Sequence, residues 1–435
     1  MKVKVKAVVS GTSRPMKDSG IEWIGLIPTT WRVIRHKYIM HKEKVICDQY
    51  KGEEIISLTM NGVVVRDLTA GGKMPSSFDG YQYVEPEDLL LCLFDIDVTP
   101  RCVGVVHDAG LTSPAYSRFK VHEGFYNAYY DYLLRTIDDS KVFVHVSKNL
   151  RNSLTESDFG ALPSIAPPYK EQKQIADYLD IECARIDSVI EKTRESIEEY
   201  NKLKQVIITE AVTKGIHPNR EKVDSGVEWI GTLATGYNIC RLKYLLAKPL
   251  QYGANSSGCP YEEALPRFIR ITDITHEGHL KHNNLLSLPK EDATGYILHD
   301  NELLFARSGA TVGKAFLFKK EYGHAAFAGY LIRAVLNEEL LPELLFYYTQ
   351  SSVYENWKQQ VFIQSTIQNI GADKYYELPV PIPPKNEQAK ILDFIVEKAG
   401  MIDSIIRKKD ALIHSLENYK KSMIFEYVTG KKEVK

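Results

Sequence analysis

Two long stretches of the chain place apolar residues at alternating spacings of three and four positions. In the first stretch these positions are Ala176, Leu179, Cys183, Ile186, Ile190, Thr193, Ile197, Tyr200, Lys204, Ile207 and Ala211. In the second they are Leu392, Ile395, Ala399, Ile402, Ile406, Lys409, Ile413, Leu416, Lys420, Met423 and Tyr427, each 216 residues after its counterpart. The polar exceptions fall at matching places. This spacing is typical of a coiled-coil seam, so we expect two long helices that pair with each other, antiparallel.

Both helices have a clear start signal. Pro167-Pro168 and Pro383-Pro384 are each followed by a Glu-Gln pair, and proline fits the first turn of a helix. A single helix over 171–213 would span roughly 64 Å. The alternative interpretation is that each apolar stripe faces its own globular domain. The narrowness of the stripes and the length of the helices favour the paired arrangement.

The segments between these blocks, 40–166 and 246–382, are predicted to be mixed and strand-rich. Asn61-Gly62 separates two β-prone runs and predicts a hairpin. Further along, DLLLCLF and CVGVV in the first segment stand in the same order as ELLFA and TVGKAFLF in the second. The loops between these paired runs differ completely. Similar strands with different loops are what two copies of one fold would show if they bind different targets.

A repeated phrase defines the organisation of the whole chain. DSGIEWIG begins at Asp18, and DSGVEWIG begins at Asp224 in the same register, 206 residues later. Arg35, Lys37 and Tyr38 recur as Arg241, Lys243 and Tyr244. The helical blocks repeat as well, so the order is A–B–A′–B′ with a pseudo-twofold relation. The predicted fold class is α+β: two mixed, strand-rich domains separated by two long helices that pair as an antiparallel coiled coil.

Composition excludes few functions. The chain has 435 residues, 44% hydrophobic and 26% charged, with a formal net charge of −1, so a nucleic-acid binder would have to gather its basic residues on one face. The six cysteines form no CxxC pair and no zinc spacing. No apolar run approaches 18 residues and no signal peptide is visible, so we expect a cytoplasmic protein without a membrane segment.

Two motifs resemble catalytic or nucleotide-binding sites but lack the required groups. Ala166-Pro-Pro-Tyr169 is similar to a motif of amino-methyltransferases, but alanine provides no acceptor for the target amine, and the second copy, Ile382-Pro-Pro-Lys385, also lacks the aromatic residue. Gly309–Ala315 resembles a phosphate loop that is one residue short, with alanine in place of the magnesium-binding hydroxyl residue. No metal or catalytic constellation is evident. The sequence therefore predicts binding surfaces rather than an active site.

The order of blocks resembles the specificity subunits of type I restriction–modification systems, over essentially the whole chain. The resemblance is carried by DSGIEWIG with a following P-x-x-W, by its echo, and by the two Pro-Pro-x-x-Glu-Gln helices with their IDS segments. It implies target-recognition domains at 16–166 and 216–382, each reading half of a bipartite, asymmetric site in double-stranded DNA. The helices at 167–215 and 383–435 would set the spacing. Residues 1–15 would form a tail outside the family pattern.

The resemblance also implies the partners. Two modification (methyltransferase) subunits would dock on the chain and carry S-adenosylmethionine for adenine methylation, and ATP- and Mg²⁺-dependent restriction subunits would translocate and cut DNA. The chain itself would bind no cofactor or metal and catalyse nothing. Two alternatives are a DNA methyltransferase in its own right and a coiled-coil scaffold without DNA contact.

Polar side chains in the divergent segments are the candidates for reading bases. Arg and Lys suit guanine, whereas Asn and Gln suit adenine. The candidates in the first domain are Arg66, Lys73, Arg101, Ser117 and Arg118. Those in the second are Arg267, Arg270, Asp273, Arg307, Ser308, Lys314, Gln364, Ser365, Thr366, Gln368 and Asn369. Any of them could instead contact phosphate, which positions the protein without specifying sequence.

Overall fold

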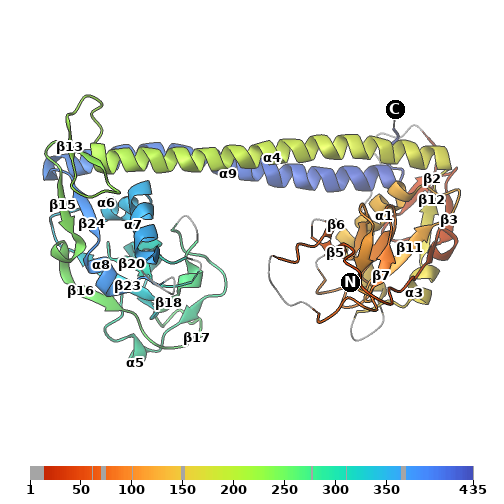
Figure 1. Ribbon diagram of the computed structural model, residues 1–435, viewed down its shortest axis with the longest axis horizontal. Helices are drawn as coiled ribbons and strands as arrows, with labels where there is room; N and C mark the ends of the chain where they lie inside the picture. Colours follow the sequence, from red (N-terminus) through yellow and green to blue (C-terminus); the bar gives the residue numbers. More distant parts are fainter. Residues whose placement is uncertain are drawn as a thin grey trace. The chain divides into compact units, whose positions relative to one another are not determined.

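The computed structural model divides the chain into two compact units. It describes residues 14–60, 62–69, 75–99, 101–147, 152–275, 278–309, 311–363 and 369–434. The first unit comprises Met1–Lys192 and Ala411–Lys435, and the second comprises Thr193–Asp410. The boundary passes through two long helices, α4 (Tyr169–Lys214) and α9 (Lys385–Val428). Each unit therefore contains one strand-rich domain and part of each helix (Figure 1).

The two helices pair antiparallel in both units, as predicted. In the first unit the Lys420 ammonium binds both carboxylate oxygens of Asp187 at 2.6 and 2.7 Å. In the second, Lys204 binds Asp403 at 2.7 Å. Asp187 precedes Lys204 along α4, whereas its partner Lys420 follows Asp403 along α9. The two helices therefore run in opposite directions. Every predicted seam position is buried or half-buried.

The matched polar positions within the stripes are explained by these ion pairs. Lys204 and Lys420 are 216 residues apart, and so are their partners Asp187 and Asp403, which belong to the repeated IDS segments. A third polar position, Lys409, lies with its ammonium 5.6 Å from the centre of the Tyr200 ring. The lysine stems cover apolar surface while their charges are satisfied across the seam.

The ends of the helices also pack on the domains. Leu179 and Ile186 belong to the same core as Tyr129 and Leu133 of α1 (Asn127–Asp139). In the second unit, Ile395 shares a core with Leu345 and other residues of its own domain. The alternative that the stripes face their own domains therefore describes these ends, while the interhelical pairs describe the rest.

Each domain contains two four-stranded sheets. In the first unit one sheet has the order β4-β11-β8-β9, with strands Met40–Lys42, Ser117–Val121, Leu89–Leu91 and Val103–Val105. The other has the order β6-β5-β10-β7, with strands Gly62–Val65, Ile55–Thr59, Gly110–Thr112 and Gln82–Val84. The predicted hairpin is the antiparallel pair β5–β6, although Asn61 itself lies outside the described residues. The helices of this domain are α1, α2 (Val142–Val146) and α3 (Glu156–Ala161).

The second unit repeats the strand order of the first of these sheets, whereas its other sheet has a different order. Its sheets have the orders β16-β23-β20-β21 and β17-β19-β18-β22. The strands are Leu246–Tyr252, Leu331–Leu336, Leu303–Ala306 and Ala315–Leu317 in one sheet, and Cys259–Pro260, Leu286–Ser287, Arg267–Ile269 and Ala325–Phe327 in the other. The domain helices are α5 (Lys290–Ala293), α6 (Pro342–Tyr348), α7 (Ser352–Ile363) and α8 (Ala372–Tyr376). In both units the second sheet contains one parallel pair, β5–β10 and β18–β22, among antiparallel ones.

Two short antiparallel strand pairs in each unit lie where the chain enters the domain and where it leaves for the long helix. The repeated phrase lies between β1 (Met16–Asp18) and β2 (Leu26–Pro28), and in the second copy between β13 (Lys222–Asp224) and β14 (Thr232–Ala234). The next strands, β3 (Arg32–Arg35) and β15 (Asn238–Arg241), pair with β12 (Pro163–Ala166) and β24 (Pro379–Ile382). The strand that enters each domain thus pairs with the strand that leaves it for the long helix.

A glutamate in the first turn of each long helix holds the repeated block. Glu171 forms an ion pair with Arg14 and accepts the indole hydrogen bond of Trp31 at 2.8 Å. Glu387 pairs with Arg220 at 2.5 Å, and this guanidinium lies 5.4 Å from the centre of the Tyr237 ring. Arg220 stands 206 residues after Arg14. The repeat therefore begins at Arg14, inside the segment predicted to be a tail; residues 1–13 lie outside the described residues.

The glutamine that follows each glutamate joins the helix to its domain. Gln172 accepts a hydrogen bond from the Tyr126 backbone N–H at 2.7 Å, just before α1. Gln388 accepts one from the Leu341 N–H at 3.0 Å, just before α6. Both side chains are buried and donate to the carbonyl of the first proline of their Pro-Pro pair. Each glutamine thereby satisfies an N–H group at the start of a helix that has no partner within it.

Aspartate in place of Ile190 and Ile406 should open the helix pair. Large-to-small core changes cost about 2–5 kcal/mol each, and an unpaired buried charge costs more. Denaturant unfolding measures the loss. The matched control is Ile181→Asp in α4, where the isoleucine is 54% exposed, and this change should stay within about 0.5 kcal/mol of wild type. Unchanged stability of the double variant would contradict the seam.

His36 should make the first unit sensitive to acid. Its ring is buried and stacks on Phe159 at 4.7 Å, and burial lowers the pKa of the imidazole from 6.5 to about 4. Between these values the unfolded chain binds a proton that the native chain does not. The histidine's contribution is therefore intact above pH 6.5 and falls by up to about 3 kcal/mol toward pH 4.

Substitution by leucine tests this dependence, because Leu242 occupies the same position of the second repeat. Urea unfolding of wild type and His36→Leu at pH 7 and at pH 4.5 should show a smaller acid loss for the variant. Equal losses would show that His36 does not contribute.

Candidate nucleic-acid interface

The strongest cluster of candidate residues surrounds Arg307, where strand β20 ends. The Arg307 N–H donates to the Tyr330 carbonyl at 3.0 Å, and the Arg307 carbonyl accepts from the Ile370 N–H at 2.9 Å. Ser308 and Asn369 form an antiparallel bridge. The fold therefore brings together candidates from two separate segments of the sequence. Gln364, Ser365, Thr366 and Gln368 lie outside the described residues.

This cluster combines unused hydrogen-bonding atoms with exposed aromatic rings. Arg307 Nε and Asn369 Oδ1 are buried and have no hydrogen-bond partner among the described residues. The Arg307 guanidinium lies 4.9 Å from the centre of the Tyr252 ring. Tyr252 and Tyr330 are 40% and 62% exposed. Arginine donates to guanine, asparagine donates to adenine N7 and accepts from adenine N6, and exposed rings can stack on bases.

The two tyrosines are functional candidates that the sequence interpretation missed. Tyr330 follows Gly329 in the turn between β22 and β23, and an aromatic residue in such a turn was the available signal. Tyr252 stands at the end of β16 and gave no signal in the sequence, because its role depends on the approach of Arg307 from β20.

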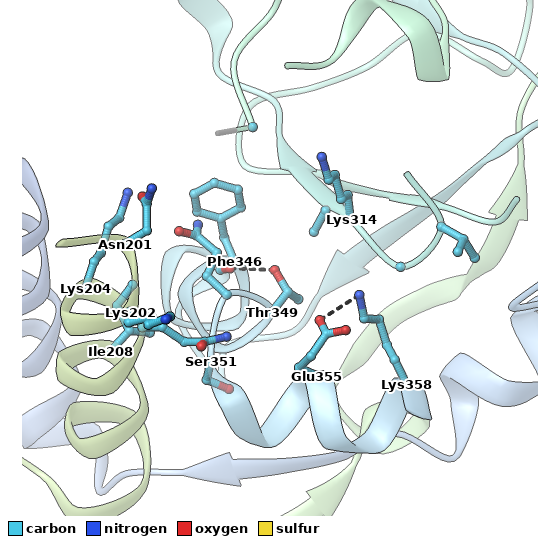
Figure 2. Close-up of a pocket in the computed structure, with 16 residues that line it drawn as sticks. Asn201, Lys202, Lys204, Ile208, Lys314, Phe346, Thr349, Ser351, Glu355 and Lys358 are labelled. Carbon is cyan, nitrogen blue, oxygen red and sulfur yellow. Dashed lines mark hydrogen bonds and ion pairs between the residues drawn. The ribbon is translucent and has the colours of Figure 1, made fainter. Parts of the chain in front are cut away.

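A cleft lined by polar and basic residues lies in the same unit, between α4 and the domain (Figure 2). It has a volume of about 580 Å³, and Lys202, Lys204, Lys314 and Lys358 are among its lining residues. Lys204 is held by Asp403, and Lys358 binds Glu355 at 2.7 Å. Four ammonium groups with a single carboxylate in the lining suit a phosphate group.

The phosphate-loop resemblance has a different explanation. Lys314 lines this cleft, but the residues that follow form strand β21 rather than a helix. A phosphate loop depends on the N–H groups at the start of a helix. Gly313, at φ 80°, lies against the Lys358 side chain instead, where a Cβ atom would be 2.2 Å from Lys358 Cδ. The glycine thus permits close packing of the cleft wall.

Arg118 is a correction to the sequence interpretation. It is 2% exposed, and its Nε atom donates to Asp88 at 2.5 Å while Nη2 binds Glu85 at 3.1 Å. Burial raises the pKa of the Asp88 carboxyl, although Arg118 opposes the shift. Arg118 therefore belongs to a buried ion pair with Asp88 and is not available at the surface for a base contact.

The second unit contains the same device. Arg333 of β23 binds Glu302, just before β20, at 3.3 Å. Glu302 and Asp88 are the acidic residues that precede the matched Leu-Leu pairs in the sequence. Each acid therefore pairs with an arginine on the neighbouring strand of the sheet.

Asp273 is also buried, in an ion pair with the half-buried Arg270. Asp273 is 5% exposed and accepts two hydrogen bonds from the Arg270 guanidinium, at 2.8 and 3.0 Å, and one from its backbone N–H. The hydrogen bonds that this carboxylate accepts all come from Arg270 rather than from the outside of the domain. The half-buried Arg267 donates to the Lys281 carbonyl.

The remaining candidates of the first unit are scattered. Arg66 is half-buried after β6, and Ser117 is half-buried at the start of β11. Arg101 binds Asp139 at 3.0 Å, which reduces its capacity to bind a base. Lys73 lies outside the described residues. The described part of this unit therefore shows no cluster comparable to the one around Arg307.

Comparison with known proteins shows similarity to one family. A family model described as the type I restriction modification DNA specificity domain matches residues 261–412. The type I restriction enzyme EcoBI specificity subunit of Escherichia coli is 23% identical over 399 residues, which cover 84% of this chain and 78% of the relative. The EcoKI specificity subunit of Escherichia coli strain K12 is 23% identical over 287 residues, covering 64% and 60%. The chain is thus similar to type I restriction–modification specificity subunits, and these similarities support such a subunit.

A solved structure supports the fold of the chain. It comes from work on complex assembly and conformational transition of the type I R-M system. It matches with a TM-score of 0.66 at 15% identity and covers 93% of this chain and 99% of the other. Among the described residues of the chain, no helix is long and apolar enough to cross a membrane, and no group of His, Cys, Asp and Glu is arranged to hold a metal ion.

Arg307→Ala should weaken DNA binding by about 1–3 kcal/mol and relax one base position in one half-site. Asn369→Ala should affect the same half-site, because the two residues lie in one cluster. Binding to a panel of duplexes at several salt concentrations measures both effects. Lys320→Ala, at an exposed position of the same unit, is the charge-loss control. A uniform loss on all sequences with a shallower salt dependence would assign Arg307 to phosphate instead.

Proposed function

We propose that each strand-rich domain of this specificity subunit reads one half of a bipartite, asymmetric DNA site. The carrying observation is that both units have the same framework but different chemistry at one loop. After β8 the first unit has Asp95-Ile-Asp-Val-Thr99, and after β20 the second has Arg307-Ser-Gly309. A shared framework with different loops suits two half-sites of different sequence.

The two loops also differ in how they are held. In the first unit Thr99 turns back on the loop, and its N–H and hydroxyl both donate to the Asp95 carbonyl, at 2.9 and 2.8 Å. In the second, Arg307 is held by backbone bonds on both sides and keeps an unused Nε. An acidic, self-bonded loop and a loop that contains Arg307 and Ser308 present different groups to a base pair. This supports an asymmetric rather than a palindromic target.

The long helices would set the distance between the half-sites and dock two modification subunits. In this proposal those subunits carry S-adenosylmethionine and methylate adenine, and restriction subunits supply ATP- and Mg²⁺-dependent translocation and cutting. The specificity subunit contributes recognition and assembly and no catalytic step. The matched clamps at Glu171 and Glu387 support two equivalent seats on one chain.

Methylation mapping of DNA from cells that carry the complete system tests this function. A bipartite, asymmetric methylated site is expected, and it should disappear when this chain is deleted. Binding of S-adenosylmethionine by the isolated chain would favour the alternative of a methyltransferase in its own right. A fully assembled complex with no sequence-dependent DNA binding would favour a scaffold.

A fragment ending at Gly215 should form a symmetric dimer. It keeps one reader, one copy of the repeated phrase and one seam helix, and it contains both Asp187 and Lys204, the counterparts of Asp403 and Lys420. Asp187 of each copy should therefore bind Lys204 of the other. With modification subunits added, the dimer should direct methylation to a palindrome of the first half-site.

Charge variants provide the control for this dimer. Lys204→Asp in the fragment should place two carboxylates together and weaken dimerisation, and adding Asp187→Lys should restore it. Sedimentation equilibrium gives the dimer affinity, and methylation mapping gives the site. A monomeric wild-type fragment, or methylation of the original asymmetric site, would contradict the interpretation of the repeat.

A further inference from the structure

The residues that are identical in both copies of the repeated block fall into two groups. Most have a structural role that is visible twice. Asp18 and Asp224 each accept the N–H of the glycine two residues later, and Ser19 and Ser225 accept the next N–H. The glycines themselves, at φ 69° and 68°, occupy the left-handed region. Folding of this loop accounts for their identity.

The second group has no structural role that is visible in both copies. Arg35, Lys37 and Tyr38 of the first unit are exposed, and they recur as Arg241, Lys243 and Tyr244. The tyrosines are 60% and 65% exposed. The residue buried among them differs between the copies, since His36 is replaced by Leu242. Exposed positions normally diverge more readily than buried ones, so this reversal indicates a constraint from outside the chain.

The exposed groups have the same geometry in both units. Each tyrosine is the last residue of a short 3-10 turn, His36–Tyr38 or Leu242–Tyr244, that comes directly after a short strand. The Lys37 ammonium lies 5.1 Å from the centre of the Tyr38 ring, and the Lys243 ammonium lies 5.2 Å from that of Tyr244. Each unit therefore displays an aromatic ring with a cation over its face and an arginine nearby. Such rigid aromatic and arginine groups are enriched where interfaces form.

We propose that these two Arg-x-Lys-Tyr surfaces are docking sites for two copies of one protein partner, the modification subunit. The inference rests on the proposed function. Two equal sites on one chain fit a partner that binds twice in the same way. The partner's receiving surface should be an apolar recess that takes the tyrosine, bordered by carboxylates that face the arginine and the lysine.

A cleft beside the second surface adds to this assignment. Arg241 lines it together with Trp229 of the repeated phrase, and its volume is about 720 Å³. The Trp229 indole nitrogen is buried and has no hydrogen-bond partner among the described residues. A side chain of the docked subunit could enter this cleft next to the tyrosine.

One carboxylate that contacts the second surface has no counterpart in the first. Glu377 binds Arg241 at 2.8 Å and Lys243 at 2.7 Å in the second unit. Ala161 takes the corresponding place in the first unit. The first surface therefore lacks this carboxylate partner for its arginine and lysine.

Native mass spectrometry and sedimentation velocity of the full-length chain with the modification subunit test the proposal. Wild type should bind two copies. Tyr38→Ala and Tyr244→Ala should each bind one copy at wild-type affinity and the other at least tenfold more weakly, and the double variant should weaken both. Tyr→Phe at either position should keep two copies, because the ring is retained. Tyr261→Ala, at a 48% exposed tyrosine whose ring is not repeated, is the matched control.

Each outcome has a distinct meaning. A double alanine variant that binds two copies with wild-type affinity would overturn the docking surfaces while leaving the proposed function intact. Loss of DNA affinity with unchanged partner binding would overturn them too and assign these residues to DNA. A wild-type chain that binds no modification subunit would contradict the proposed function itself, and the docking surfaces with it.

Discussion

Burial of a narrow apolar stripe between two antiparallel helices is the constraint on which the rest of the structure depends. Helices of this length gain most of their stability from packing rather than from intrinsic propensity. Charge satisfaction across the seam reinforces the register, because Lys420 reaches Asp187 and Lys204 reaches Asp403. Each helix begins with a glutamate and a glutamine that hold the repeated block and the first domain helix. The position of each domain relative to its own helix start thus follows from the helix sequence.

The duplicated framework and the divergent loops reflect different physical requirements. Clamp residues such as Glu171 and Glu387 must meet a specific partner, so substitution would leave a charge unpaired in a half-buried site. The loops after β8 and β20 are bounded by strands that stay paired whatever the loop contains. Sequence can change there at little cost to stability, and recognition can diverge while the framework is retained.

Buried arginines show where a residue type alone is ambiguous. Arg118 and Arg307 both lie in divergent segments, and both suit guanine by their chemistry. Arg118 sits in a strand beside Asp88, where an ion pair buries it, whereas Arg307 follows its strand and keeps an unused nitrogen. The difference depends on which strand pairs with which, since β11 places Arg118 against β8.

The sequence by itself predicted the helices, their antiparallel pairing, the duplicated order and the resemblance to specificity subunits, because periodic stripes and repeated phrases can be recognised without knowledge of contacts. It also located Arg307 and Asn369 separately. Only the tertiary structure decided that these two meet, that Arg118 and Asp273 are buried in ion pairs, and that Arg14 belongs to the repeat. These facts rest on contacts between residues far apart in the chain, and sheet pairing and burial decide such contacts through the combined packing of many side chains.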